Sequence, residues 1–523
     1  MPGGIFSVAS GEVRYLLIEA GYNACLPVCC QVRRLIFRDS AFVRWKKRDF
    51  PDVVLLYPGL SCLLITFPRV LAFTVTLCTG SAMAAPPDIT VATFNVSLSP
   101  NTEAALPALL ANPGSSNPKK IAEIIQRVAP DVLFINELNY DGSRANLDAL
   151  HDNFIAHSQN GQSAQNYPHR FVAASNTGVH SGFDFNNSGS VNDTPGSTTY
   201  GDDCFGFGRF PGQYAMAVFS KFPIRADEVR TFRNFLWKDM PGALLPDIAG
   251  SPAPNDWYRP EELAVFRLSS KSHWDVPIEV EGHVVHLLGS HPTPPTFDGP
   301  EDRNGRRNHD EIRLWADYVD PDRDDYIYDD SGEAGGLGTG RRFVIVGDQN
   351  ADPEDGDSFA GAAQQFTLHP LIDNSFIPVS GRGGSDTAAF AGGLRVDYVL
   401  PSKAGLAILG GGVFWPVAGN PLSSLVSASD HRMVHLELRL LPLLDEAVSE
   451  LQVNLEGDDV ILAWSAAAGV KYTVWRSDTL FADDWVITNE LAPRNDVGIA
   501  QVRDEGAARG SRRRFYRLEA VFQ

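Results

Sequence analysis

The sequence predicts an α/β protein, because short apolar runs alternate with a helical pattern along most of its 523 residues. Residues 89–96 alternate β-branched side chains as a strand does, and residues 132–138 form an almost wholly apolar run that suits a buried strand. Between them, residues 118–128 repeat apolar side chains at helical spacing. Similar strand-like runs recur at residues 214–220, 284–290, 343–347, 396–400 and 433–440. Strands interleaved with helices predict an α/β domain over residues 86–440.

The end of the chain follows a different pattern. Residues 441–450 begin Leu-Pro-Leu-Leu-Asp and are typical of a linker. Beyond them, strand-like runs at residues 460–464, 472–476 and 515–522 are separated by Gly, Asp and Asn turns, with no helical period. We therefore expect residues 451–523 to form a small all-β sandwich that resembles fibronectin type III modules.

The beginning of the chain carries a targeting pattern. Arg69 is followed by a short apolar run and by the small residues 82–84, which is typical of a signal peptide over residues 69–84. We expect cleavage before Ala85. Residues 1–68 are then expected to be an extension that precedes the true start of translation or is disordered.

A membrane anchor over residues 53–79 is the alternative interpretation of the same segment. Pro58, Pro68 and Arg69 interrupt this run, whereas a spanning helix needs about 20 uninterrupted apolar residues. A cleaved signal peptide is therefore favoured. It predicts a secreted or periplasmic protein with no stable membrane insertion after processing.

The charge and the cysteines restrict the class of protein further. A formal net charge of −20 argues against broad electrostatic capture of nucleic acid. It does not exclude a nucleic acid substrate, because a local basic cleft or bound cations could still meet phosphates. Only Cys204 follows residue 85, so the downstream part of the chain cannot form an internal disulfide, and a core of this size needs none.

Polar side chains suited to catalysis stand at the ends of several predicted strands. Taken singly, each is better explained as a helix cap or a turn residue. Five such segments in order are harder to explain in that way, because the loops at strand ends usually build the site of an α/β protein. The residues are Asn95, Glu137, His291, Asp348, Asn350, Asp397, Asp430 and His431.

These residue types match the needs of phosphoester hydrolysis, which are a cation, an activated water and a stabilised leaving oxygen. Carboxylate and amide oxygens are the ligands that Mg²⁺ prefers, so Glu137 and Asp430 fit as ligands, with Asn95 in support. Asp348 and Asn350 are two residues apart and share a face of extended backbone. One of them could orient water while the other holds a phosphate oxygen.

A histidine next to a carboxylate completes the pattern. Asp430 is followed directly by His431, which places a possible ligand beside a titratable imidazole. Asp397 could accept the other ring proton and so determine the tautomer.

Together these segments resemble the endonuclease/exonuclease/phosphatase superfamily, in its pancreatic-type deoxyribonuclease-like form. The resemblance covers about residues 88–440, and one departure is Gln349, where many members have Phe. The resemblance implies a four-layer sandwich of two mixed β-sheets flanked by helices. It also implies in-line attack by water on a phosphodiester or phosphomonoester. The motifs are Thr93-Phe-Asn95, Asn136-Glu137-Leu, Tyr214 to Ile224, Ser290-His291-Pro, Gly347-Asp348-Gln-Asn350, Arg395-Val-Asp397-Tyr398 and Ser429-Asp430-His431.

The resemblance implies a metal site. Glu137 becomes the principal ligand, assisted by Asn95 and Asp430, and the metal is Mg²⁺ or Mn²⁺. Separately from the resemblance, the oxygen-rich side chains and glycines of the loop of residues 181–203 could hold a structural Ca²⁺. Its spacing misses the helix–loop–helix ligand pattern, so a plain surface loop is favoured there.

The resemblance also implies the catalytic roles. Asp348 orients or deprotonates the water, and Asn350 positions the phosphate. His431 contacts the scissile phosphate or takes part in proton transfer, and Asp397 holds it. His291 stabilises the phosphoryl group or aids the leaving oxygen.

An Arg-rich extension after the second histidine departs from the better-known nucleases. It contains Arg303, Arg306 and Arg307. Since arginine binds phosphate bidentately, one hypothesis is a substrate clamp. The other is an ordinary solvated start of a helix that continues over residues 311–319.

The sequence therefore predicts a metal-dependent phosphoesterase. The acidic body favours a small phosphoester over long polyanions, and no exposed apolar hairpin points to a sphingomyelinase-like lipase. The alternatives are an extracellular nuclease acting on DNA or RNA and a catalytically silent binding module that works through its C-terminal sandwich. In either case the C-terminal module could dock to a surface or a protein partner.

Overall fold

The computed structural model describes the α/β body almost completely. The predicted signal peptide of residues 69–84, most of the extension before it and most of the linker 441–450 lie outside the described residues. The described residues are 16–20, 87–248, 250–251, 256–441, 443, 452–456, 459–466, 470–477, 486–492, 498–505 and 514–522.

A six-stranded mixed sheet forms one half of the body, in the order β11-β12-β2-β3-β5-β4. Its strands β2 and β3 are parallel, and the other neighbours are antiparallel. The strands are β2 (Asp88–Leu98), β3 (Val132–Leu138), β4 (His169–Phe171), β5 (Met216–Ser220), β11 (Leu406–Val413) and β12 (Val434–Leu440).

A five-stranded mixed sheet forms the other half, in the order β10-β9-β8-β7-β6, with β8 and β9 parallel. Apolar side chains of both sheets, among them Val91, Phe134, Trp274, Val346 and Leu436, form one buried cluster between them. The strands are β6 (Arg230–Thr231), β7 (His273–Val280), β8 (His283–Ser290), β9 (Phe343–Asp348) and β10 (Asp397–Pro401).

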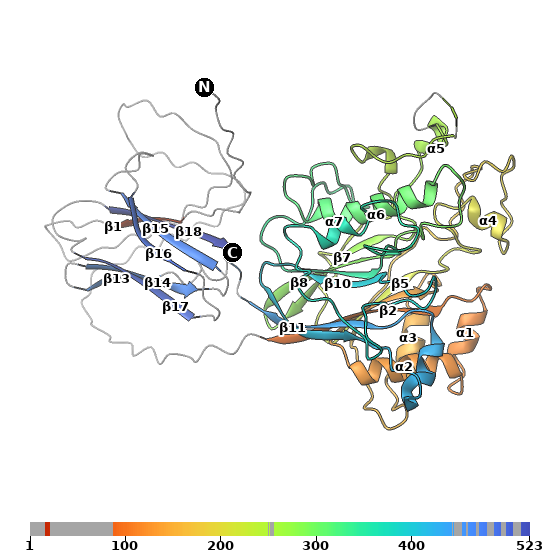
Figure 1. Cartoon of the computed structure of the whole chain (residues 1–523), viewed down its shortest axis with the longest axis horizontal. Helices are drawn as coiled ribbons and strands as arrows, with labels where there is room; N and C mark the ends of the chain where they lie inside the picture. Colours follow the sequence, from red (N-terminus) through yellow and green to blue (C-terminus); the bar gives the residue numbers. More distant parts are fainter. Residues whose placement is uncertain are drawn as a thin grey trace.

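Helices cover the outer face of each sheet (Figure 1). The six-stranded sheet is covered by α1 (Ala105–Leu110), α2 (Ser116–Val128), α3 (Ala145–Leu150), the π-helix η1 (His151–Ile155) and the 3-10 helix η3 (Pro421–Ala428). The five-stranded sheet is covered by the 3-10 helix η2 (Trp237–Asp239), α6 (Arg303–Tyr318) and α7 (Gln364–Thr367), while α5 (Pro260–Leu263) lies farther out, beyond α6, and α4 (Thr198–Asp202) lies in a long loop. The predicted four-layer sandwich is confirmed.

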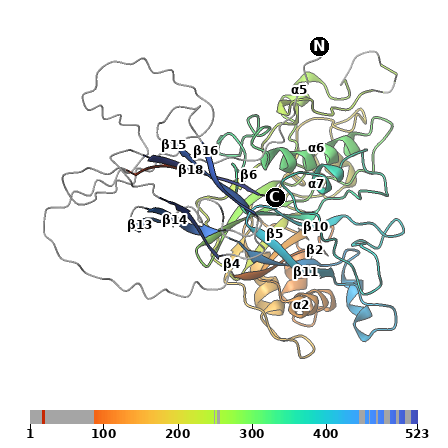
Figure 2. The ribbon, with the colours of Figure 1, turned by 60° about the vertical axis from the view of Figure 1, so that its left-hand side comes forward.

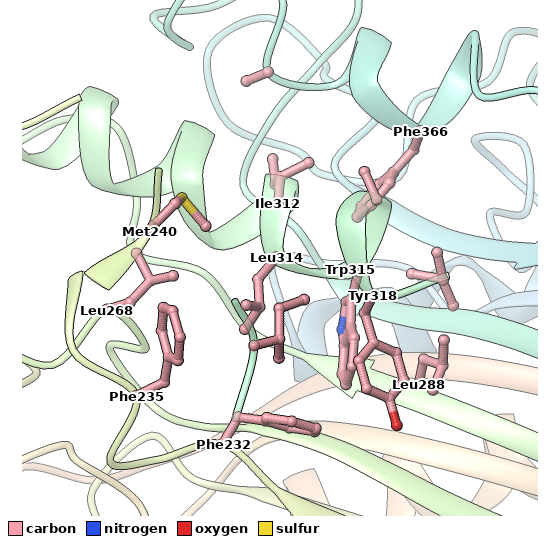
Figure 3. Close-up of a cluster of buried hydrophobic side chains, with 14 of the residues drawn as sticks. Phe232, Phe235, Met240, Leu268, Leu288, Ile312, Leu314, Trp315, Tyr318 and Phe366 are labelled. Atoms are coloured by element: carbon pink, nitrogen blue, oxygen red, sulfur yellow. The ribbon is translucent and has the colours of Figure 1, made fainter. Parts of the chain in front are cut away.

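The helix α6 packs through aromatic side chains. Trp315 and Tyr318 lie beside Phe232 and Leu288 in a large buried cluster (Figure 3). The helix expected over residues 311–319 begins earlier, at Arg303, so the Arg-rich extension belongs to its first turns.

The C-terminal strands form two small sheets, as expected for an all-β region (Figure 2). One sheet has the order β13-β14-β17, and the other β1-β18-β15-β16. In the second sheet, β1 (Leu16–Ala20) pairs antiparallel with β18 although it belongs to the expected N-terminal extension. The fibronectin type III likeness and the domain boundaries stay predictions. The other strands are β13 (Gln452–Glu456), β14 (Asp459–Ala466), β15 (Val470–Ser477), β16 (Val486–Leu491), β17 (Gly498–Asp504) and β18 (Arg514–Phe522).

No helix among the described residues combines the length and the apolar character that a bilayer crossing requires.

Candidate functional site

The two sheets bring the predicted strand-end residues together at one edge of the sandwich. Asn136 at the end of β3 bridges the sheets, since its Nδ2 donates to the carbonyl of Ser290 at 3.3 Å and its Oδ1 accepts from the backbone N–H of Asp348 at 3.1 Å. This amide therefore links β3 of one sheet to β8 and β9 of the other. The site forms around that junction.

Asp348, the last residue of β9, is the centre of the site. Its Oδ2 accepts a hydrogen bond from Asn95 Nδ2 at 3.0 Å, and the same oxygen lies 3.4 Å from His291 Nε2 and 3.5 Å from His431 Nε2. Its Oδ1 accepts from the backbone N–H of Asn350 at 3.0 Å. Five predicted residues from four separate segments thus meet at one buried carboxylate.

The turn around Asp348 depends on its neighbours. Gly347 has a φ of 130°, and a Cβ there would lie 2.0 Å from the carbonyl oxygen of Ser290, so the close approach of β9 to β8 requires glycine. Gln349 is fully buried and accepts from Ser290 Oγ at 3.0 Å. Gln349, which departs from the family pattern, therefore stabilises this turn through a buried hydrogen bond to the end of β8.

His431 is held between two carboxylates. Its Nδ1 lies 2.9 Å from Asp397 Oδ2, as the sequence predicts. Ser429 Oγ accepts from the backbone N–H of His431 at 3.0 Å and donates to the carbonyl of Asn95 at 2.7 Å, which ties this segment to β2. The partly exposed ring of Phe390 lies edge-on to the imidazole, with 5.4 Å between centroids.

The pKa values of the two histidines beside Asp348 are shifted in opposite directions. Burial alone would lower the pKa of His431, but the carboxylates of Asp397 and Asp348 raise it to about 10. Burial and the nearby Lys271 lower the pKa of His291. His431 is therefore an imidazolium at neutral pH, whereas the neutral form of His291 is favoured.

The pKa values of the carboxylates of Asp348 and Asp397 are also shifted in opposite directions. Burial acts to raise the pKa of Asp348, but His431 and His291 outweigh it and hold that pKa well below its ordinary value. Burial raises the pKa of Asp397 to about 6, and His431 limits the rise. Asp348 is consequently the stably ionised member of the pair.

Glu137 lies beside this centre, on the side of the six-stranded sheet. Its Oε1 accepts from Asn95 Nδ2 at 3.2 Å and its Oε2 from Ser99 Oγ at 2.9 Å, while the side chain stays half-buried. The left-handed φ of 60° turns Glu137 out of the regular strand. Asp430, expected to complete the ligand set, is exposed next to His431.

Two groups of side chains could hold a hard cation. Among the described residues, the ligand atoms of Asp348, Asp397 and His431 lie within 4.8 Å of one another. A metal at this group would compete with the hydrogen bond from His431 to Asp397. Glu137 keeps lone pairs on both oxygens, so it could supply carboxylate ligands to Mg²⁺ or Mn²⁺, while the Asn95 amide faces it with Nδ2 and its Oδ1 accepts from the backbone N–H of Ser97 at 3.1 Å.

The three predicted clamp arginines lie in different surroundings. Arg307 is buried, and its guanidinium donates to three backbone carbonyls, those of Phe205, Arg267 and Leu268, at 2.6 to 3.0 Å. Arg303 forms an ion pair with Glu301. Arg306 is half-buried over the ring of Phe359, and its Nε has no hydrogen-bond partner among the described residues. Among the described residues, the Arg306 guanidinium forms no hydrogen bond or ion pair, whereas those of Arg303 and Arg307 do.

The oxygen-rich loop of residues 181–203 is organised by its own hydrogen bonds. Asp184 accepts the backbone N–H groups of Ser188 and Gly189, and the buried Asp203 accepts those of Phe185 and Asn192. These carboxylates are thus engaged with backbone donors. A structural Ca²⁺ in this loop stays a prediction.

Three polar residues at the site were not predicted from the sequence. Lys271 is buried just before β7, and its Nζ donates to the carbonyl of Pro292 at 3.2 Å. Asn308 and Glu311 are fully buried on α6 and bond to the loops around His291 and Asp348. Their spacing, with Ile312 and Trp315, placed them on the apolar side of the helix, which is the signal that could have found them.

The model of the Endonuclease/Exonuclease/phosphatase family matches residues 92–431. A comparison with curated protein sequences gave no match. Similar solved structures include an endonuclease/exonuclease/phosphatase family protein from Leptotrichia buccalis, with 14% identity over 66% of this chain and 98% of that one and a TM-score of 0.36.

Two further structures show the same range of similarity. Sphingomyelinase C from Streptomyces griseocarneus has 13% identity over 67% of this chain and 99% of that one, with a TM-score of 0.36. The human Nocturnin catalytic domain has 13% identity over 68% and 95%, with a TM-score of 0.36. Because the family model spans well over half of the chain, this protein belongs to the endonuclease/exonuclease/phosphatase family, whose members hydrolyse phosphoester bonds.

Proposed function

We propose that this chain is a secreted, metal-dependent phosphoesterase that hydrolyses a phosphodiester or phosphomonoester by in-line attack of water. One observation carries the proposal, which is the convergence of His291 and His431 on the same oxygen of Asp348 with Asp397 behind His431. A buried carboxylate between one neutral and one charged imidazole offers both an acceptor and a donor of protons. A binding module would not need this pairing.

The residues divide the reaction between them. Asp348 accepts a hydrogen bond from the attacking water and orients it, and its low pKa makes it a weak base on its own. The proton that the water loses passes by way of Asp348 to the neutral His291. The water oxygen bonds to phosphorus as the bond to the leaving oxygen breaks, and the His431 imidazolium gives that oxygen a proton. Asn350 holds a phosphoryl oxygen.

A divalent cation fits the same arrangement. Glu137 and Asn95 would hold Mg²⁺ or Mn²⁺, with Asp430 as a further ligand. Bound there, the cation neutralises negative charge on the phosphoryl oxygens. Asn95 also donates to both Glu137 and Asp348, so it sets the spacing between the ligand and the water-orienting carboxylate.

The choice of substrate is a separate part of the proposal. Arg306, whose guanidinium lies over Phe359, is the member of the clamp best suited to bind a phosphate of the substrate. The acidic chain favours a small phosphoester, with nucleic acid as the alternative substrate. The pancreatic-type deoxyribonuclease-like subtype remains a prediction.

A panel of substrates tests the function. Residues 86–523 would be assayed with bis-p-nitrophenyl phosphate, p-nitrophenyl phosphate, plasmid DNA, RNA and sphingomyelin, with and without EDTA. We expect EDTA-sensitive turnover of at least one phosphoester. The proposal fails if none is turned over.

Secretion and docking need their own tests. The signal peptide over residues 69–84 predicts that the exported protein begins at Ala85, which N-terminal sequencing would check. An exported protein that retains residues 69–84 would contradict it. Docking by the C-terminal module predicts that removing residues 451–523 leaves turnover of a small substrate unchanged and weakens binding to cells or surfaces.

A further inference from the structure

One side of α6 bonds to three loops that carry the site. Arg307 donates to the carbonyls of Arg267 and Leu268, which precede β7. Asn308 Nδ2 donates to the carbonyl of Thr293 at 2.8 Å and to that of Gln349 at 2.9 Å. A single turn of helix thus bonds to the segment before β7, the segment after β8 and the turn after β9.

Glu311, one turn after Arg307, bonds to two of these segments with its two oxygens. Oε1 accepts from the backbone N–H of Ser270 at 2.5 Å, and Oε2 accepts from the backbone N–H of Thr293 at 2.7 Å. Its backbone carbonyl also accepts from His273 Nε2 at 2.9 Å. Glu311 therefore bonds to the segment before β7, to the segment after β8 and, through its carbonyl, to the side chain of His273 in β7.

The two segments held by Glu311 carry groups that face the reaction centre. Lys271 follows Ser270, and His291 lies two residues before Thr293. Lys271 Nζ donates to the carbonyl of Pro292 at 3.2 Å, and the same carbonyl accepts from Asn350 Nδ2 at 3.1 Å. The ammonium and the phosphate-positioning amide therefore meet at one oxygen, next to His291.

The cost of burying Glu311 argues that its position matters. The side chain is fully buried, and an ionised carboxylate there is unfavourable unless it is paired and hydrogen-bonded. Two backbone N–H groups meet that need, and Arg307 and Lys271 are the nearby cations. An apolar side chain would fill the same space but would hold neither loop.

We propose that Glu311 is a positioning residue, which holds the Ser270–Lys271 turn and the His291–Thr293 segment in register with Asp348. The inference rests on the proposed phosphoesterase function. It also gives the extension after His291 a role that neither hypothesis from the sequence contained. The buried side of α6 holds the segments that carry the site, while Arg306 on the same helix remains available to bind the substrate.

The test compares Glu311→Gln with Glu311→Asp and a matched control. Gln keeps the shape but sets an amide N–H against a backbone N–H, and Asp keeps the charge but shortens the reach. We expect Glu311→Gln to lower kcat on bis-p-nitrophenyl phosphate about 10- to 100-fold, with a smaller change in KM. Glu311→Asp should lie between it and the unaltered protein.

The control is Glu262→Gln in α5. Glu262 is also fully buried and accepts a backbone N–H, from Arg259 at 2.8 Å. It should change kcat less than about twofold, since it touches no site segment. Equal losses in both variants would indicate a general folding defect and would overturn the proposal.

A double variant separates positioning from stability. If Glu311 acts through His291 and Lys271, its substitution should cost much less in a His291→Ala background, because the group it positions is gone. An undiminished loss in that background, or full activity of both Glu311→Gln and Glu311→Asp, would contradict the role. No turnover by the unaltered protein would instead count against the proposed function.

Discussion

The site has two sides that are built differently. On the side of the six-stranded sheet, Glu137 is half-buried at the end of its strand, with only part of its bonding capacity used within the chain. On the side of α6, Arg307 and Glu311 are buried, and their charged groups are bonded to backbone carbonyls and N–H groups. The first side is suited to bind a ligand, and the second holds the segments that carry Lys271, His291 and the turn after Asp348. Substitutions on the first side should therefore impair catalysis or ligand binding. Substitutions on the α6 side should instead impair the positioning of the site or the stability of the fold.

The largest effect is expected at the junction of the two sides. His431→Ala removes the imidazolium between Asp397 and Asp348, so kcat should fall about 10³-fold, and the free energy of unfolding should fall as well because two buried carboxylates lose their partner. His157→Ala, at an exposed position, is the matched control and should keep full activity. Equal rates for the two variants in a bis-p-nitrophenyl phosphate assay would place the chemistry elsewhere.

The α6 side should also be the more sensitive to acid. His273 is fully buried against the carbonyl of Glu311, and burial lowers its pKa to about 4. Between pH 4 and about 6.5, the unfolded chain therefore binds a proton that the folded chain does not. The buried neutral His273 therefore makes its full contribution to the free energy of unfolding above pH 6.5. That contribution is lost as the pH falls toward 4, which lowers the free energy of unfolding by about 3 kcal/mol.

Urea unfolding at several pH values measures that loss. His273→Gln should have a shallower fall in the free energy of unfolding between pH 6.5 and 4.5 than the unaltered protein. Parallel curves for the two proteins would show that His273 does not titrate as described.

A third prediction compares two neighbours on α6. Arg307→Met leaves three carbonyl oxygens without their donor, so the free energy of unfolding should fall by about 2 to 3 kcal/mol. Arg306→Met should change it by less than about 0.5 kcal/mol. Urea unfolding of both variants is the measurement, and a reversed order would contradict the assignment of Arg307 to the framework.

The smallest effect concerns substrate binding. Arg306→Ala should raise KM for a phosphoester about three- to tenfold while kcat changes little, because a partly exposed charge binds phosphate weakly. Steady-state kinetics on at least two substrates checks this. An unchanged KM for every phosphoester would remove Arg306 from the substrate site.

The strand side could be predicted from the sequence for a physical reason. A strand buried on both faces is nearly all apolar, so a carboxylate or amide at its end, such as Asn95 or Glu137, stands out. The apolar run of β3 was predicted at residues 132–138, where the structure has it. The pairing of Asp397 with His431 followed from chemistry alone and is confirmed at 2.9 Å.

The α6 side could not be predicted in the same way. Polar residues in a helix usually face water, so Asn308 and Glu311 resemble a solvated face by residue type, and only their spacing with Ile312 and Trp315 indicates burial. Strand β7 was also missed, because His273, Asp275 and Pro277 interrupt its apolar pattern although all three are buried. Their partners lie far along the chain, and only the tertiary structure brings them together.

The most direct test of the account is a magnesium titration of phosphoester hydrolysis. After EDTA treatment, the unaltered protein should be inactive and should recover fully with Mg²⁺. Glu137→Gln should need about tenfold more Mg²⁺ for half-maximal rate, whereas Glu279→Gln, at a half-buried glutamate on β7 that pairs with Arg225, should behave as the unaltered protein. Turnover that survives EDTA, or an identical Mg²⁺ requirement in Glu137→Gln, would contradict the assignment of a metal-dependent centre to these strand ends.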